Sequence, residues 1–364
     1  MSVSGTAAEV NAGFRQRVAD GARTVPVVFD LPTRAGLDSD APQAHGLVGH
    51  CGVPVDSIDD MRVLFGGLRL ERIFPTLAAD VSAAPLLLLY QLVAEEHGTP
   101  ARRLTGAVRN DVFRRILDRG PDGLPHRPKL RLAMNVVAYG LAELPRWQCL
   151  SICGHHLAGP DADPALEVAR TVAGGVEYLR AAATAGLDPR AVARRLTICL
   201  TAGATARESR AKLRAARTVW TRTAHDHLTP GLPTPRLYVQ HPRHRSPAPA
   251  LRPLPRALDA AALAVLDRMH RQHGTLTLLG HAVPTRRRVP RPHPASQALQ
   301  AGQAERLAKL RAWRIQSAVD EALLRLHQAA RSTDNVLYPM KDALAARATV
   351  GEVCTTLHRA WSPH

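Results

Sequence analysis

The sequence predicts an α/β fold, a TIM-type (β/α) barrel followed by a helical C-terminal segment. The first two-thirds of the 364 residues alternates short apolar runs with amphipathic stretches, and repeated strand–helix alternation is typical of a parallel sheet covered by helices. About seven such units occur, which favours a barrel over an open doubly wound sheet. No GxGxxG motif or P-loop follows the first strand, which weakens a nucleotide-binding alternative.

The predicted elements alternate along the chain. Short apolar runs predict strands at 24–32, 104–111, 149–156, 193–203, 235–240 and 274–281. Apolar residues at helical spacing predict helices at 57–68, 84–98, 112–120, 128–145, 165–186, 208–228 and 256–274. The helix at 57–68 begins with a Ser cap and an Asp-rich first turn, which is a helix start signal.

Two regions follow from this pattern. Residues 1–296 form the predicted barrel, modified or incomplete at its last strand, and residues 297–364 form a purely helical tail. The tail contains one or two helices before Ser332 and two more after it, with a break near Thr349–Gly351. Two Pro/Arg-rich segments, 241–258 and 281–296, show neither helix nor strand periodicity, so we expect loops there.

The charge balance is strongly basic without predicting a nucleic-acid partner. The formal net charge is +17, but only four of the 48 basic residues are Lys, as GC-rich codon usage would produce. The two Arg-rich segments are interpreted as solvated loops. The alternative is that they form anion-binding loops, with DNA disfavoured as the anion.

Cysteine usage and hydropathy predict a cytoplasmic location. The five Cys residues show no CxxC motif and no Cys/His metal spacing, so no metal site is predicted. No signal peptide opens the sequence and no run of 18 apolar residues occurs. We therefore expect no membrane association.

A pair of adjacent histidines stands where a functional site is expected. Leu150–Cys153 reads as a short buried strand, and Gly154, His155 and His156 follow it. Neighbouring residues of a strand point to opposite faces, so the two histidines cannot both be core residues. In a barrel, the carboxyl ends of the strands form the active face.

Several ordered stretches resemble the methylmalonyl-CoA mutase family. They are "VVFDLPTRAGLDSDAP", "GVPVDSIDDMRVLFGGLRLERI", "LTGAVRND", "LPRWQCLSICGHH" and "KLRAARTVW". The ordered run covers roughly residues 4–240, and the tail from Thr333 is similar to the end of the large chain in mutases with a separate cobalamin subunit. The resemblance implies a TIM barrel that threads CoA through its axis, with adenosylcobalamin capping the carboxyl ends of the strands.

The sequence also departs from that family. Arg109 stands where a substrate-contacting Gln is expected, and His155 replaces a Tyr. Thr197 replaces a Ser. The chain begins about where the family's active-site Tyr should stand, and the family's eighth strand has no obvious equivalent. No stretch resembles the cobalamin-binding DxHxxG domain, so we expect no cofactor bound by this chain alone and adenosylcobalamin only if a separate subunit supplies it.

The resemblance implies roles for several residues. His156 occupies the position that hydrogen-bonds the thioester carbonyl, and Arg119 occupies the position that holds the substrate carboxylate. Arg109, Arg195 and Thr197 occupy other substrate-contacting positions. Each role has a plainer alternative. His155 would only fill the space where the family's Tyr packs, and His156 would be a bystander. Arg119 would be a helix-end Arg paired with a surface Asp.

These observations leave three hypotheses. The first is an isomerase or lyase that acts on a carboxylated acyl thioester, bound to CoA or a carrier protein, without cobalamin. His156 would polarise the carbonyl and His155 would act as acid or base in epimerisation, decarboxylation or isomerisation. The second is a non-catalytic subunit that pairs with a mutase-like chain in a homo- or heterodimer. The third is a mutase large subunit that needs a separate cobalamin-binding protein.

Overall fold

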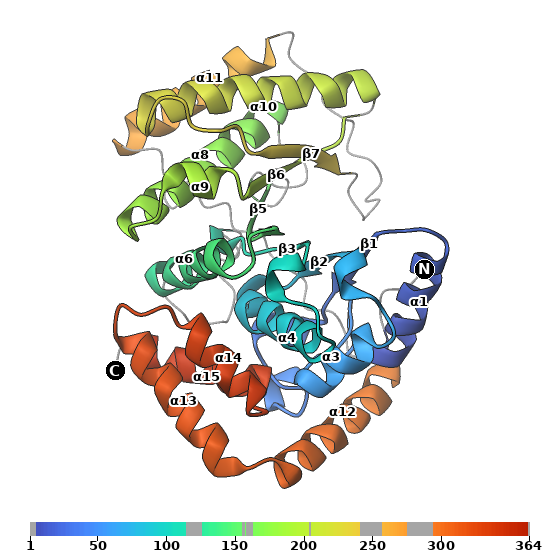
Figure 1. Cartoon of the computed structure of the whole chain (residues 1–364). Coiled ribbons are helices and arrows are strands. Elements are labelled where there is room, and N and C mark those ends of the chain that lie inside the picture. The colour runs from blue at the N-terminus through green and yellow to red at the C-terminus, as the bar shows by residue number, and fades with distance from the viewer. Residues whose placement is uncertain are drawn as a thin grey trace. The chain divides into compact units, whose positions relative to one another are not determined.

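The computed structural model describes residues 5–113, 126–154, 157, 163–203, 205–240, 257–274 and 294–362. The chain divides into two compact units, and Figure 1 colours it by residue number. Unit 1 comprises Met1–Asn110, Pro121–Cys149 and Arg288–His364, and unit 2 comprises Asp111–Gly120 and Leu150–Arg287. Each unit holds its own parallel sheet.

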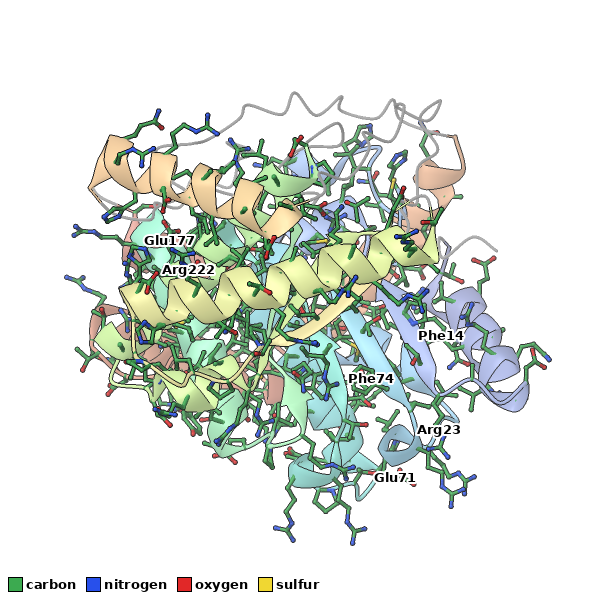
Figure 2. The ribbon with its side chains drawn as sticks, turned by 90° about the horizontal axis from the view of Figure 1, so that it is seen from above. Phe14, Arg23, Glu71, Phe74, Glu177 and Arg222 are labelled. Carbon is green, nitrogen blue, oxygen red and sulfur yellow. The ribbon has the colours of Figure 1, made fainter. Side chains whose placement is uncertain are left out.

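The described part of unit 1 contains a four-stranded parallel sheet in the order β1-β2-β3-β4. The strands are β1 (Thr24–Val28), β2 (Phe74–Ala78), β3 (Gly106–Val108) and β4 (Trp147–Gln148). Consecutive strands are neighbours, as they are in a barrel wall. A backbone hydrogen bond joins the starts of β1 and β2, because the Phe74 N–H donates to the Arg23 carbonyl at 2.7 Å. Figure 2 labels both residues.

Helices cover this sheet because they carry apolar faces. The helices before the tail are α1 (Ala7–Ala19), α2 (Leu31–Ala35), α3 (Ile58–Phe65), α4 (Ala83–Glu96) and α6 (His126–Ala142), with 3-10 turns η1 (Pro42–Ala44), η2 (Leu70–Arg72), η3 (Asp80–Ser82) and η4 (Ala101–Arg103). Helix α4 is buried over most of its length. Phe65 of α3 lies 6.3 Å from Phe14 and 4.9 Å from Tyr90 between ring centroids, so aromatic packing joins α1, α3 and α4.

The helical tail belongs to unit 1. It consists of α12 (Pro294–Trp313), α13 (Gln316–Arg331), α14 (Leu337–Ala345) and α15 (Val350–Trp361). Three buried carboxylates of the barrel segment accept hydrogen bonds from the tail, namely Asp38, Asp56 and Asp60. Asp38 accepts from the Thr349 hydroxyl at 2.6 Å and from the Gly351 N–H at 2.7 Å, and the Gln303 amide donates to Asp56 at 3.0 Å. Asp56 and Asp60 also accept from residues 39, 56 and 57 of the barrel segment, whereas the partners of Asp38 come from the tail, which thereby satisfies a buried carboxylate.

The described part of unit 2 holds a three-stranded parallel sheet in the order β5-β6-β7. The strands are β5 (Leu150–Cys153), β6 (Leu196–Thr201) and β7 (Arg236–Gln240), and the helices are α8 (Pro164–Thr184), α9 (Pro189–Ala193), α10 (Ala206–His227) and α11 (Leu258–His273). Strand β6 is buried along nearly its whole length, as a central parallel strand should be. Helices α8, α10 and α11 pack together, and Figure 2 labels Glu177 of α8 and Arg222 of α10.

The expected α/β class, parallel sheets and helical tail are confirmed, whereas closure of one barrel stays a prediction. The strand β2 and the helix α1 were not expected, because β2 (FPTLA) combines Pro75 with a single β-branched residue and α1 has only three large apolar residues, Val10, Phe14 and Val18. The predicted helix at 112–120 and strand at 274–281 lie almost wholly outside the described residues. The two Arg-rich segments also lie largely outside, but their described ends, Leu258 and 294–296, are helical and not loop.

Candidate functional site

The predicted site residues fall in different parts of the chain. His155, His156 and Arg119 lie outside the described residues. Arg109 follows β3 in unit 1, half-buried, and its N–H donates to the Leu77 carbonyl at 2.9 Å. Thr197 lies in β6 of unit 2, where it is 7% exposed, and half-buried Arg195 precedes the same strand. Arg195 and Thr197 are thus near neighbours at the start of β6, and Arg109 lies in the other unit.

The β5 strand ends against a buried carboxylate. The Cys153 N–H donates to Asp111 Oδ2 across a long 3.4 Å contact, and the Tyr178 hydroxyl donates to Asp111 Oδ1 at 2.9 Å. The Val112 N–H donates to the same hydroxyl oxygen at 2.8 Å. Burial raises the pKa of Tyr178 well above its ordinary value, so its hydroxyl stays a hydrogen-bond donor to the carboxylate.

Gly154 makes a close backbone approach directly after β5. A Cβ atom at this position would lie 2.7 Å from Thr171 Oγ1, 2.8 Å from Glu167 Cγ and 2.9 Å from Glu167 Oε1. These distances are shorter than van der Waals contact, so only glycine fits without movement. The backbone that leads into His155 and His156 is therefore pressed against helix α8.

Glu167 also fixes the carboxyl end of β6. Its Oε1 accepts from the Thr201 N–H at 2.6 Å and from the Thr201 hydroxyl at 2.9 Å. Its Oε2 accepts from Lys212 Nζ at 2.6 Å, and the same ammonium donates to the Thr201 carbonyl at 3.0 Å. Glu167 and Lys212 are only 5% and 6% exposed at their side chains. A buried ion pair persists when further hydrogen bonds satisfy both charges, as they do here.

Asp111, Glu167 and Lys212 thus hold the carboxyl ends of β5 and β6 in a defined position. Sequence reasoning missed all three as site-supporting residues. Their signals were present, because Asp111 ends the quoted "LTGAVRND" stretch and Lys212 is one of only four lysines. Glu167 is one of two acids in helix α8, and it lies next to Val168 and Ala169 in the apolar-rich first half of the helix. A charged residue on an apolar helix face is a reason to search for a buried partner.

A cavity of about 560 Å³ lies elsewhere, in unit 1. Its lining includes Arg69, Glu71, His97 and Arg103, which belong to the turns before β2 and β3. This is the amino-terminal side of those strands, whereas barrel chemistry takes place at the carboxyl ends. Within the described ranges, no three His, Cys, Asp or Glu side chains are grouped so that they could hold a metal ion.

A sequence model of the methylmalonyl-CoA mutase family matches residues 1–241 and 281–363. This chain belongs to the methylmalonyl-CoA mutase family. It is 41% identical over 215 residues to the methylmalonyl-CoA mutase large subunit of Streptomyces virginiae, covering 59% of this chain and 29% of that one. It is 38% identical over 220 residues to the large subunit of Propionibacterium freudenreichii subsp. shermanii, covering 60% and 30%.

A third relative is the methylmalonyl-CoA mutase of Escherichia coli strain K12, at 36% identity over 215 residues, covering 59% of this chain and 30% of the relative. The chain therefore spans about 30% of the length of the curated mutase-family relatives it matches. None of the described helices is both long and apolar enough to cross a membrane.

Proposed function

We propose that this chain binds a carboxylated acyl thioester at the carboxyl ends of the unit 2 strands and polarises its carbonyl with His156. The observation that carries the proposal is the frame of Asp111, Glu167 and Lys212 around Gly154, because it fixes the backbone directly before the two histidines. A site that positions a hydrogen-bond donor rigidly stabilises the charge that develops on the carbonyl oxygen.

The other residues take the roles that the family resemblance implies. Arg119 would hold the substrate carboxylate, since a planar guanidinium makes two parallel hydrogen bonds to it. Arg109, Arg195 and Thr197 would contact the rest of the thioester. His155 would act as acid or base, because an imidazole gains or loses a proton near neutral pH. Such a set suits enolate chemistry, namely epimerisation, decarboxylation or isomerisation.

The proposed chemistry has no step that uses adenosylcobalamin, the cofactor of the resembling mutases. Strand β7 ends at Gln240, and His241, Arg243 and Arg245 follow directly in the sequence. Charged side chains at a strand end attract water, whereas radical intermediates require its exclusion. A basic sequence directly after β7 therefore disfavours a dry face against a corrin ring. We therefore expect no adenosylcobalamin binding by this chain alone, and a titration that shows micromolar binding would contradict it.

A second candidate is a mutase large subunit that needs a separate cobalamin-binding protein. It is favoured by the 41% identity to a protein named as a methylmalonyl-CoA mutase large subunit. Incubation with methylmalonyl-CoA separates the two candidates. Turnover by the pure chain supports cobalamin-independent chemistry. Turnover that requires both adenosylcobalamin and a small subunit supports the second candidate. Tight binding without turnover under either condition indicates a non-catalytic partner subunit, in a homo- or heterodimer.

The central test compares variants of the two histidines and Arg119. His156→Ala should lower turnover about 10²-fold or more, because it deletes a hydrogen bond that strengthens as the enolate forms. His155→Tyr should have a milder effect. Arg119→Lys should weaken the binding of carboxylated substrates and leave the binding of non-carboxylated ones unchanged, since Lys cannot reproduce the bidentate contact. Unchanged affinity and turnover in folded His156→Ala would refute the catalytic assignment.

A further inference from the structure

Helix α10 carries a line of four exposed arginines. They are Arg207, Arg210, Arg214 and Arg217, which we call the α10 arginine stripe. Their spacing of three, four and three residues places them within an arc of roughly 80° and along about 15 Å of the helix. The opposite face of α10 is buried, with Lys212, Val219 and Trp220 directed into unit 2.

The α10 arginine stripe has no acidic partner within the described part of the chain. The other charged residues of α10 behave differently. Lys212 pairs with Glu167, Arg222 lies 3.9 Å from Asp226, and Glu208 takes part in the capping box with Thr205. Like charges three or four residues apart destabilise a helix. Four such arginines are therefore unfavourable for this helix until carboxylates or phosphates approach them.

The stripe begins at the rim of the proposed site. Helix α10 starts at the N-cap Thr205, four residues after β6 ends at Thr201. Lys212, in the second turn, still reaches the Thr201 carbonyl at 3.0 Å. The first turns of α10 therefore lie beside the carboxyl end of β6, and the arginines lead away from it along the outer face.

We propose that the α10 arginine stripe docks an acidic helix of a small carrier protein that delivers the acyl group as a phosphopantetheine thioester. This rests on the proposed function and selects a carrier-bound substrate over free acyl-CoA. Carboxylates three and four residues apart on a partner helix match the arginine spacing, and each guanidinium offers a bidentate contact. The start of the stripe at the rim lets a flexible arm reach the strand ends.

Two other ligand classes fit the stripe less well. The phosphates of a free nucleotide are bound by groups that converge on one point, whereas these guanidinium groups form a line. Single-stranded nucleic acid requires exposed aromatic side chains for base stacking. The one aromatic residue of α10, Trp220, is fully buried.

Charge reversal tests the docking surface. Arg210→Glu/Arg214→Glu removes the centre of the stripe, and Arg268→Glu/Arg271→Glu on the exposed face of α11 is the matched control in the same unit. The probe is a bacterial acyl carrier protein, both unloaded and charged with methylmalonyl-phosphopantetheine, and affinity is measured at 50 and 200 mM salt. The stripe variant should bind both forms of the carrier protein at least tenfold more weakly than the unmodified chain does. The control variant should lose less than twofold in affinity, because docking charges act locally.

Substrate affinity and restored charge complementarity complete the test. Methylmalonyl-CoA affinity should be equal in the stripe variant and the unmodified chain, and reversing acidic residues on the carrier helix to Arg should restore binding to the variant. The inference is overturned if the carrier protein does not bind, if binding survives the stripe reversal, or if duplex DNA or anionic vesicles bind the stripe as tightly. Stripe-dependent binding of the carrier protein that is equally tight with and without the acyl group, together with no binding of methylmalonyl-CoA, would refute the proposed function alone.

Discussion

At the scale of single residues, the end of β5 depends on the absence of one side chain. Gly154 leaves no room for a Cβ between itself, Thr171 and Glu167. Gly154→Ala should therefore lower the free energy of unfolding by about 1–3 kcal/mol, the usual cost of overpacking a tight site. Urea denaturation measures it.

The control for Gly154→Ala is Gly13→Ala in α1, where a Cβ would meet nothing within 4 Å. That change should leave stability equal or raise it by about 0.5–1 kcal/mol, since Ala is favoured over Gly inside a helix. Equal effects of the two substitutions would show that the close approach at Gly154 does not constrain the strand end.

Lys212 is the second residue with a large expected effect. Lys212→Met leaves the buried Glu167 carboxylate without its cation, which costs about 3–5 kcal/mol of stability when such a pair is broken from one side. Chemical denaturation again measures the loss. Lys309→Met, in the exposed pair with Glu305 on α12, is the matched control and should cause no measurable loss.

A loss below 1 kcal/mol in Lys212→Met would contradict a structural role for this pair. The double variant Glu167→Gln/Lys212→Met separates the charge from the packing. It should recover part of the loss, because no uncompensated charge then remains buried.

At the scale of elements, the tail helices are joined to the barrel segment through Asp38. This carboxylate accepts from Thr349 and Gly351 at the start of α15 and pairs with Arg311 of α12 at 3.0 Å. Burial raises its pKa to about 6, although these hydrogen bonds oppose the shift. In the unfolded chain an Asp titrates near about 3.9.

The sign of the pH effect follows from that difference. The folded state binds the proton more tightly, so the contribution of Asp38 to stability is fully present below about pH 4 and is lost as pH rises to about 6. Asp38→Asn should therefore reduce the fall in stability between pH 4 and 6.5 by about 2–3 kcal/mol. Glu321→Gln on the exposed face of α13 should leave the slope unchanged, and a slope unaltered by Asp38→Asn would refute the assignment.

At the scale of the whole molecule, the net charge of +17 raises the question of nucleic-acid binding. Several of the described arginines have acidic partners, such as Arg314 with Glu352 at 2.6 Å and Arg311 with Asp38 and Asp40. We expect no binding of a 20-base-pair duplex at 200 mM salt in a fluorescence anisotropy titration, since electrostatic contacts to phosphates weaken steeply with salt. Binding that persists at this salt concentration would contradict the protein-directed role of the α10 stripe.

The sequence alone determined the α/β class, most strands and helices, the helical tail and the family. Local patterns suffice for these, because alternating apolar runs such as Leu196–Thr201 and capped amphipathic helices such as α10 encode them within a few neighbouring residues. It failed at β2 (FPTLA), which has one β-branched residue where β1 (TVPVV) has four, and which parallel neighbours on both sides stabilise. Tertiary pairing outweighs local propensity there.

Only the tertiary structure decided what supports the candidate site. Glu167 and Lys212 are 45 residues apart, and Asp111 is 42 residues from Cys153, so no local pattern pairs them. Likewise, Asp38 meets Thr349 across 311 residues. Burial makes these pairings necessary, because a charge removed from water must find its partner wherever the fold places one. The sequence identified residues beside strand ends, and the fold determined which buried charges hold those ends in place.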